Sequence, residues 1–252
     1  MPARRFFVEG IGAVGSAVEI RGSDAAKIVR VLRLRAGETI EIVDSSGTLF
    51  AATITLAGPV VNATLAAVVA VEPSNEPELR IDVAQALPKA RKMEFVVEKA
   101  TELGAAVILP FRSERTIPAD AGDAKLERWR RLAKTAAQQC GRLTIPEVAP
   151  VVPSFDALLA RFGEYDAILF AWELAPHEAL RERLPQLLRD ARRLLIVVGP
   201  EGGFTHAEAD AANACGATPI WLGRRILRTE TAAMALLAIV DAFGPELAPS
   251  AS

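Results

Sequence analysis

Residues 193–208 read RLLIVVGPEGGFTHAE, and residues 220–233 read IWLGRRILRTETAA. Each segment has an apolar run of β type, then a glycine turn, then the opening of a helix. Parallel strands bring their carboxyl ends, and the turns that follow them, to one edge of a sheet. The two segments together therefore predict one small-molecule pocket at that edge, formed largely by backbone groups.

From residue 79 onward, strands and helices alternate along the chain. The predicted strands are residues 81–87, 106–110, 166–172, 194–198 and 219–223. The predicted helices are residues 89–103, 123–140, 154–161, 177–188 and 229–243, and Thr205 with Glu208 forms a capping box that opens one more. This alternation predicts an α/β fold with a parallel sheet and helices on both of its faces.

The first 72 residues have a different pattern, in which short strands alternate with turns. The predicted strands are residues 5–8, 17–20, 39–43, 49–56 and 61–71, with a hairpin turn at Asp44–Gly47. One helix is predicted over Asp24–Leu34, with Ser23 as its N-cap. Strands spaced this closely indicate a small β-barrel. Residues 73–78 are polar and contain two prolines, so we predict a barrel domain over 1–72, a linker over 73–78, a second domain over 79–246 and a tail over 247–252.

The composition argues against several classes of protein. The 252 residues carry a net charge of −2, so no overall positive field would attract a nucleic acid, and any basic surface has to be local. The two cysteines lie far apart in the sequence without a CxxC pair, so we expect no metal site. The first residues lack the apolar core of a signal peptide, and the longest apolar run, residues 232–240, is too short to cross a bilayer. We therefore expect a cytoplasmic protein without a membrane partner.

The same apolar run predicts how the last helix packs. A helix with no polar face has to be buried on every side. Two arrangements satisfy this requirement: a central position in the core of the domain, or contact with a second copy of the chain.

The first glycine turn, GPEGG at residues 199–203, has features that restrict its ligand. Gly199, Gly202 and Gly203 permit backbone angles that other residues avoid, and they let a ligand approach the main chain. The spacing matches neither the Walker A loop nor the GxGxxG dinucleotide motif. Glu201 at the tip would repel phosphate, which argues against an anionic ligand. A tight turn from strand to helix, without a ligand, is the structural alternative.

The second glycine turn, LGRRILRTET at residues 222–231, offers both apolar and charged groups. The apolar residues suited to line a slot beside Gly223 are Leu222, Ile226 and Leu227. Arg228 and Glu230 are placed to reach a substrate in such a pocket. An ion pair that holds the loop is the alternative role for both.

A local basic cluster lies in the N-terminal part. Its members are Arg4, Arg5, Lys27, Arg30 and Arg33. The last three recur every third residue on the predicted helix, a spacing that suits contact with RNA phosphates. Residues 1–72 as a whole hold seven basic and seven acidic residues, so a solvated helix face is the alternative interpretation.

Seven segments, in order, carry a resemblance that covers nearly the whole chain. They are RRFFV at 4–8, IVRVLRLRAGETIEIVD at 28–44, ALPKARKMEFVVEKATELG at 86–104, PFRSERT at 110–116, QQCGR at 138–142 followed by IPEV, VVGPEGGFTHAE at 197–208, and LGRRILRTETAA at 222–233. With these segments the chain resembles the RsmE family of ribosomal RNA small-subunit methyltransferases. The resemblance implies a fold of the SPOUT class, in which a PUA-like barrel that helps to hold RNA precedes a parallel sheet whose C-terminal chain is threaded into a deep trefoil knot. It also implies a homodimer formed through the knotted region, S-adenosylmethionine as cofactor, and N3-methyluridine in the 16S ribosomal RNA of the small subunit as product.

The resemblance makes the two glycine turns a cofactor site. The implied cofactor-binding residues are Leu169, Phe170, Val198, Gly199, Gly202, Gly203, Leu222, Gly223, Ile226 and Leu227. Methyl transfer requires the uridine ring nitrogen to lose its proton and attack the sulfonium methyl group. We expect Glu201 or Glu230 to accept this proton, and Arg228 to stabilise the negative charge on the uracil oxygens. The basic cluster is the expected RNA contact.

Two other functions fit the sequence. A non-catalytic RNA-binding or ribosome-assembly factor would use the same barrel and basic cluster, and would bind RNA without affinity for the cofactor. A SPOUT methyltransferase that acts on ribose or on transfer RNA would share the cofactor but modify a different nucleoside.

Overall fold

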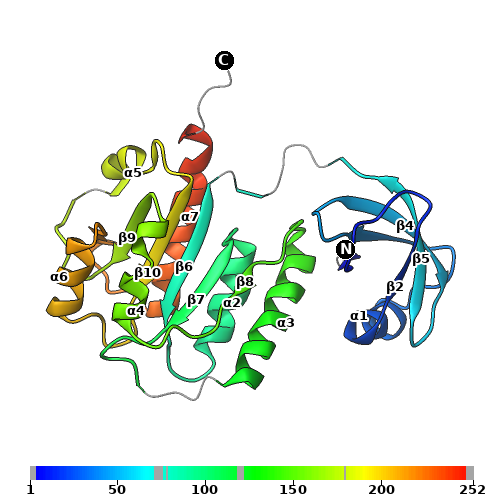
Figure 1. The fold of residues 1–252 in the computed structure, drawn as a ribbon, viewed down its shortest axis with the longest axis horizontal. Helices are drawn as coiled ribbons and strands as arrows, with labels where there is room; N and C mark the ends of the chain where they lie inside the picture. Colours follow the sequence, from blue (N-terminus) through cyan, green and yellow to red (C-terminus); the bar gives the residue numbers. More distant parts are fainter. Residues whose placement is uncertain (1–3, 71–75, 78, 118–121, 179, 248–252) are drawn as a thin grey trace. The chain divides into compact units, whose positions relative to one another are not determined.

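The computed structural model describes residues 4–70, 76–77, 79–117, 122–178 and 180–247 (Figure 1). The chain divides into two compact units, which are described separately. One contains residues 1–76 together with 137–144, and the other contains residues 77–136 and 145–252. Residues 137–144 therefore group with the N-terminal unit, although the sequence pattern assigned them to the second domain. Most of the predicted linker and of the predicted tail lies outside the described residues.

The N-terminal unit is built on one curled five-stranded sheet with the order β1-β3-β4-β5-β2. Its strands are β1 (Arg5–Phe7), β2 (Ala17–Ile20), β3 (Thr39–Val43), β4 (Leu49–Leu56) and β5 (Val61–Val68). The register between β4 and β5 shifts at two places, and such irregularities increase the bend of a strand. The predicted hairpin turn joins β3 and β4, where the Asp44 carboxylate accepts hydrogen bonds from the backbone N–H groups of Gly12, Ser46 and Thr48.

The helix of this unit differs from the prediction. It begins as α1 (Gly22–Ala26), continues as a π-helical turn η1 (Lys27–Val31), and has Arg21 rather than Ser23 as its N-cap, without a side-chain capping bond. It ends before Arg33, which has a φ of 54°, a conformation that no helix can include. The wider turn keeps Ala25 and Ile28 in the core of the unit.

Residues 137–144 are tied to this unit by a charged network. The Glu76 carboxylate accepts hydrogen bonds from the Arg142 guanidinium at 2.7 and 3.0 Å, and from the backbone N–H groups of Leu143 and Thr144. Gln138 is buried and donates to the Asp24 carboxylate at 3.0 Å. These bonds explain why the end of a long helix groups with the sheet of the first unit.

The second unit has a six-stranded sheet with the order β11-β9-β10-β6-β7-β8, in which every neighbouring pair is parallel. Its strands are β6 (Arg80–Ala86), β7 (Val107–Phe111), β8 (Glu147–Val148), β9 (Ala167–Ala171), β10 (Arg193–Val198) and β11 (Thr218–Ile220). Its helices are α2 (Lys92–Glu102), α3 (Asp123–Cys140), α4 (Phe155–Leu159), α5 (Leu180–Leu188), α6 (His206–Ala214) and α7 (Thr229–Leu247), with a 3-10 turn η2 (Phe162–Glu164) between α4 and β9.

Two apolar cores cover the two faces of this sheet. Residues of α2, α3, α5 and α7 pack on one face, and residues of α4 and α6 pack on the other. The strands β9, β10, β6 and β7 are buried on both faces, as their continuous apolar runs require, whereas the edge strands β8 and β11 are partly exposed. The α/β fold with a parallel sheet between two helical layers is therefore confirmed (Figure 1).

The last helix, α7, is buried along one side only. Ala233, Leu236, Leu237 and Val240 are fully buried against the sheet and its neighbouring helices. Thr231, Ala238 and Ala242 on the opposite side are exposed. Burial on every side is therefore not achieved within one chain. Among the described residues, no helix has the length and apolar character that a membrane span needs.

Candidate active site

A cavity of about 1250 Å³ lies at the carboxyl ends of β9, β10 and β11. Its lining comes mainly from the segments that follow these strands, within residues 171–177, 198–204 and 220–229, and from Lys92 at the start of α2. We call residues 199–204 the first glycine loop and residues 222–228 the second glycine loop. Sites for drug-sized ligands typically measure about 300–1,000 Å³, so this cavity has room for a small molecule and part of a second ligand.

The structure brings together most of the residues that the sequence predicted for ligand binding. Those that line the cavity are Val198, Gly199, Gly202, Gly203, Leu222, Gly223, Ile226 and Leu227. Leu169 and Phe170 do not line it, because both side chains are fully buried in the cores on opposite faces of the sheet; the cavity begins at Ala171. Ile226 is 88% exposed and lies at the rim, so it does not form the wall of a closed slot.

The first glycine loop needs its glycines for packing as well as for conformation. A Cβ atom on Gly199 would lie 3.0 Å from the ring of Phe204, which is fixed in a cluster with Phe170, Phe155 and Phe111. Gly203 has a φ of 66°, in the left-handed region that other residues rarely adopt. The loop therefore exposes main chain to the cavity and is held in one shape.

Arg115, from the loop after β7, fixes the first glycine loop from outside. Its Nη1 donates to the Gly202 carbonyl at 2.8 Å and to the Phe204 carbonyl at 3.4 Å. A Cβ atom on Gly202 would lie 3.3 Å from the Arg115 Cβ, so the close approach of this side chain also depends on glycine. Sequence reasoning did not give Arg115 a role, although it lies in one of the segments that carry the resemblance.

Lys92 links the two glycine loops. Its ammonium lies 2.9 Å from Glu201 Oε1, in the first loop, and 3.3 Å from Glu230 Oε2, just after the second. The longer contact is an ion pair rather than a well-aligned hydrogen bond. Glu201 Oε1 also accepts from the backbone N–H of Lys89 at 3.0 Å. Two carboxylates and one ammonium leave this cluster with one net negative charge.

These contacts change the expected role of Glu201. Partial burial raises the pKa of the Glu201 carboxyl, but hydrogen bonds from Lys92 and from the backbone N–H of Lys89 outweigh it and bring the pKa below its ordinary value. The hydrogen bond with Glu201 raises the pKa of Lys92 more than desolvation lowers it. Glu201 is thus an ionised, paired carboxylate and a weak base. Glu230 is engaged by the same ammonium and does not line the cavity, so both predicted proton acceptors are paired with Lys92.

A second link between the loops is buried. The Thr229 hydroxyl donates to the Gly199 carbonyl and accepts a hydrogen bond from Gln85 Nε2 at 2.7 Å. Gln85 is fully buried in β6 and donates its other N–H to the Ala86 carbonyl. The signal that sequence reasoning missed was Gln85 itself, because a polar residue inside an apolar central strand needs a specific partner.

Arg228 lines the cavity with its charge available. It is exposed, and no hydrogen bond or ion pair engages its guanidinium among the described residues. The same holds for Arg224 and Arg225 in the same loop. The predicted electrostatic role of Arg228 is therefore compatible with its position.

The basic cluster of the N-terminal unit is less uniform than predicted. Arg30 and Arg33 are exposed and have no side-chain partner in the described part of the chain, and Arg4 is exposed with a 3.8 Å ion pair to Glu38. Lys27 donates to Gln138 at 3.3 Å and lies over the Phe6 ring. Arg5 is buried, and its guanidinium donates hydrogen bonds to the Glu41 carboxylate and to the Gly141 carbonyl. Its side chain is therefore not available to RNA, contrary to the prediction.

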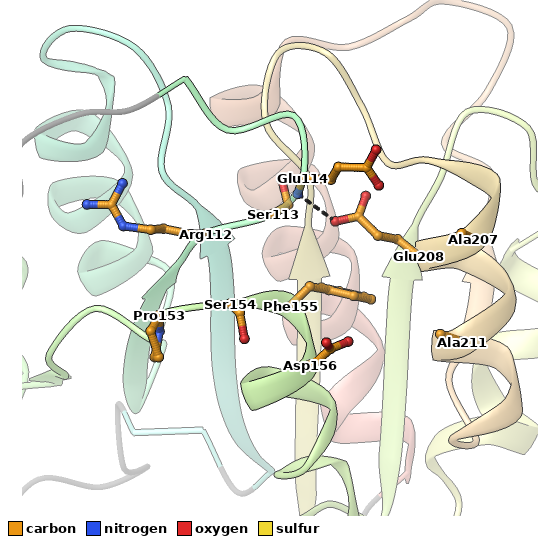
Figure 2. Close-up of a pocket in the computed structure, with 10 residues that line it drawn as sticks. All are labelled: Arg112, Ser113, Glu114, Pro153, Ser154, Phe155, Asp156, Ala207, Glu208 and Ala211. Carbon is orange, nitrogen blue, oxygen red and sulfur yellow. Dashed lines mark hydrogen bonds between the residues drawn. The ribbon is translucent and has the colours of Figure 1, made fainter.

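A smaller cavity of about 390 Å³ lies between α4, α6 and the loop after β7 (Figure 2). Its polar lining is mainly acidic, from Glu114, Asp156 and Glu208, and the Arg112 side chain points away from Glu208 in Figure 2. The Glu208 carboxylate is buried and already hydrogen-bonded. It accepts a hydrogen bond from the Glu114 backbone N–H at 2.9 Å and completes the predicted capping box with Thr205. This cavity is the weaker candidate for a ligand site. Across the described residues there is no group of three or more His, Cys, Asp or Glu side chains suited to a metal ion.

The comparison with protein families agrees with this geometry. A model of the RNA methyltransferase domain matches residues 75–241, and a model of the RNA methyltransferase PUA domain matches residues 28–59. The parallel sheet, the glycine loops and these matches define the class of protein as an RNA methyltransferase.

Individual relatives narrow the class. A protein from Mycobacterium bovis named ribosomal RNA small subunit methyltransferase E is 33% identical over 257 residues, covering 100% of this chain and 96% of the relative. The crystal structure of a protein of that name from Neisseria gonorrhoeae, bound to S-adenosyl methionine, has a TM-score of 0.82 at 28% identity and covers 96% of this chain and 98% of that one. A methyltransferase from Legionella pneumophila, solved with bound S-adenosylmethionine, has a TM-score of 0.85 at 29% identity and the same coverage of both chains. The chain belongs to the ribosomal RNA small subunit methyltransferase E family.

Proposed function

We propose that this chain transfers a methyl group from S-adenosylmethionine to N3 of a uridine in the 16S ribosomal RNA of the small subunit. The observation that carries the proposal is the cavity in which both glycine loops meet at the carboxyl ends of parallel strands. Relatives from Neisseria gonorrhoeae and Legionella pneumophila were solved with this methyl donor bound. The choice of uridine N3 and of 16S RNA rests on the family resemblance of the seven sequence segments.

The lining of the cavity suits a cationic methyl donor. Backbone groups of Gly199, Gly202 and Gly223 offer hydrogen bonds, and Leu222 and Leu227 offer apolar surface to an adenine ring. The net negative cluster of Glu201, Lys92 and Glu230 favours a ligand that carries a sulfonium charge. The donor contains no phosphate, so the acidic loop tip does not oppose its binding.

The transfer itself is a substitution at the methyl carbon. The uridine N3 loses its proton to solvent, its electron pair attacks the methyl carbon in line, and the carbon–sulfur bond breaks with its electrons on sulfur, which leaves S-adenosylhomocysteine. Arg228 stabilises the negative charge that the uracil oxygens acquire when the proton leaves. Through their ion pairs with Lys92, Glu201 and Glu230 hold the two glycine loops in fixed positions. The positioning of the donor and the uridine by these loops supplies much of the rate.

Three wider features belong to the same proposal. The chain forms a homodimer through α7, supported by the exposed side of that apolar helix. The segment from β11 to α7 takes part in a trefoil knot. The path of the chain supports this: β11 lies at the edge of the sheet next to β9, and the chain then crosses back so that α7 packs against β10 and β6. The protein works in the cytoplasm and holds RNA with Arg4, Lys27, Arg30 and Arg33. Cell fractionation tests the location. An experimental structure in which the C-terminal segment does not pass through a loop of the chain would contradict the knot.

Calorimetric titration with S-adenosylmethionine tests the function. We expect saturable binding with one donor per chain, and loss of that binding when Gly199 is replaced by alanine. RNA binding without any affinity for the donor would instead support the non-catalytic assembly factor.

A further inference from the structure

The large cavity extends past the glycine loops to a pair of aromatic rings. The His177 ring, in the loop after β9, stacks on the Trp221 ring, just after β11, with centroids 4.3 Å apart and planes inclined by 23°. Both residues line the same cavity as the glycine loops. His177 follows β9 and Trp221 follows β11, the two strands on one side of β10. Lys92 follows β6, on the other side of β10, so the aromatic pair and Lys92 lie in different parts of the cavity.

The charged residues of the cavity also differ from one part to another. Around the first glycine loop acidic residues outnumber basic ones. Glu201 at the loop tip pairs with Lys92, and Glu173, from the segment after β9, lies so close that a Cβ on Gly203 would be 2.5 Å from its Oε1. Next to Trp221 the charged residues are basic, since Arg224 and Arg225 follow it in sequence and are exposed without partners in the described part of the chain. The acidic part suits a cationic donor, and the basic part suits phosphate.

Unpaired RNA bases are recognised by stacking on aromatic side chains, while arginine contacts the neighbouring phosphates. We propose that His177 and Trp221 form a stacking platform for an unpaired base of the RNA substrate, and that Arg224 and Arg225 bind the phosphates that flank it. This inference rests on the proposed function, and it adds an RNA site within the methyltransferase unit to the basic cluster of the N-terminal unit. The volume of about 1250 Å³ leaves room beside the donor for part of a nucleotide.

The test compares Trp221→Ala with Trp221→Phe, which keeps an aromatic ring, after thermal unfolding has shown that both variants fold. Stacking of one base contributes about 1–3 kcal/mol, so Trp221→Ala should weaken RNA binding and raise the KM for RNA by about 5- to 150-fold. Trp221→Phe should recover most of the loss, and the Kd for S-adenosylmethionine should change less than about twofold in both. Arg224→Ala with Arg225→Ala should reduce the salt dependence of RNA binding, whereas Arg189→Ala, an exposed arginine just after α5, should not.

Two outcomes would overturn the platform. If Trp221→Ala binds RNA as the wild type does, the aromatic pair only covers the edge of the sheet. If donor affinity falls as much as RNA affinity, the pair belongs to the cofactor site. RNA binding is measured without the donor, so the platform is tested even if the wild-type protein transfers no methyl group, a result that would count against the proposed function alone.

Discussion

Lys92 pairs with Glu201 in the first glycine loop and with Glu230 just after the second, and its replacement measures what this bridge contributes to donor binding. In Lys92→Met, Glu201 and Glu230 lose their shared cation and repel each other. The cluster becomes more negative, which by itself attracts a cationic donor, but the loss of the bridge releases both glycine loops from their common partner. Hydrogen bonds to charged groups contribute about 1.5–3 kcal/mol, and the partial exposure of these side chains reduces that figure. We expect the loss of the bridge to outweigh the added negative charge, so that donor affinity falls by up to about 1–2 kcal/mol in calorimetry.

Lys99 provides a matched control. It also bridges two carboxylates, those of Glu98 and Glu102, but on α2 and not in the cavity lining. Lys99→Met should leave donor affinity unchanged. Equal losses in the two variants would show that Lys92 acts only through helix stability.

Glu201 predicts a specific dependence of stability on pH. Its folded pKa lies below the ordinary value of 4.5 for a glutamate, so its ionised form stabilises the folded state above that pH, and this contribution disappears as the pH falls through the folded pKa. Glu201→Gln should therefore be less stable than the wild type in urea unfolding near neutral pH, and the difference should shrink as the pH falls below 4.5 and through the lowered folded pKa. A difference that grows in acid would contradict the assignment of an ionised Glu201.

The sequence predicted the glycine loops but not the residues that hold them. Gly199, Gly202 and Gly203 are recognisable because several glycines directly after an apolar run are typical of a turn that exposes its main chain. Nothing in the sequence distinguishes Lys92 and Arg115 from other charged residues. Lys92 follows β6 and Arg115 follows β7, and they reach the first glycine loop because β6 pairs with β10 and β7 pairs with β6. Such contacts depend on strand order, which a single sequence does not contain.

Thr229 couples the start of α7 to the strand turn after β10. Thr229→Val keeps the shape of the side chain but leaves the Gly199 carbonyl and one Gln85 N–H without partners in the core. An unsatisfied buried polar group costs about 1–3 kcal/mol, so we expect the free energy of unfolding to fall by about that amount in urea.

Thr229→Ser separates the hydrogen bond from the fit of the methyl group. It retains the hydroxyl and should lose less stability than Thr229→Val. If the serine variant is the less stable of the two, packing rather than hydrogen bonding fixes the start of α7.

Long apolar runs and capping signals predicted most helices and strands, and the failures have local causes. The helix expected from Lys89 begins at Lys92 because Ala90 has a φ of 55°, which no α-helix contains. Strand β8 has two residues and no recognisable pattern of its own. The π-helical turn at Lys27–Val31 widens the helix spacing, so the predicted basic stripe of Lys27, Arg30 and Arg33 is not a regular helix face.

The proposed homodimer can be tested on the exposed side of α7. Thr231, Ala235, Ala238 and Ala242 follow one another at helical spacing, and small residues allow two helices to approach closely. Ala238→Arg places a charge in the middle of this surface and should convert a dimer into a monomer in sedimentation analysis. Asn213→Arg, on the exposed side of α6, is the control that should remain dimeric.

The division of the chain into units was only partly accessible from composition. The last strand of the five-stranded sheet ends at Val68, before the change of pattern near residue 72, and residues 137–144 group with that sheet through Glu76 and Asp24. Contacts between residues so far apart in sequence leave no local periodicity. The sheet order β11-β9-β10-β6-β7-β8, which creates the cavity, was likewise not predicted.

The central claim, methyl transfer to uridine N3, is tested on small-subunit RNA from cells that lack N3-methyluridine. The protein is incubated with this RNA, or with the intact small ribosomal subunit, and with S-adenosylmethionine that carries a labelled methyl group. The nucleosides are then separated and identified by mass spectrometry. We predict that the label appears as N3-methyluridine in 16S ribosomal RNA and nowhere else. Label on a ribose or in transfer RNA, or RNA that stays unlabelled while the protein binds it, would contradict this account.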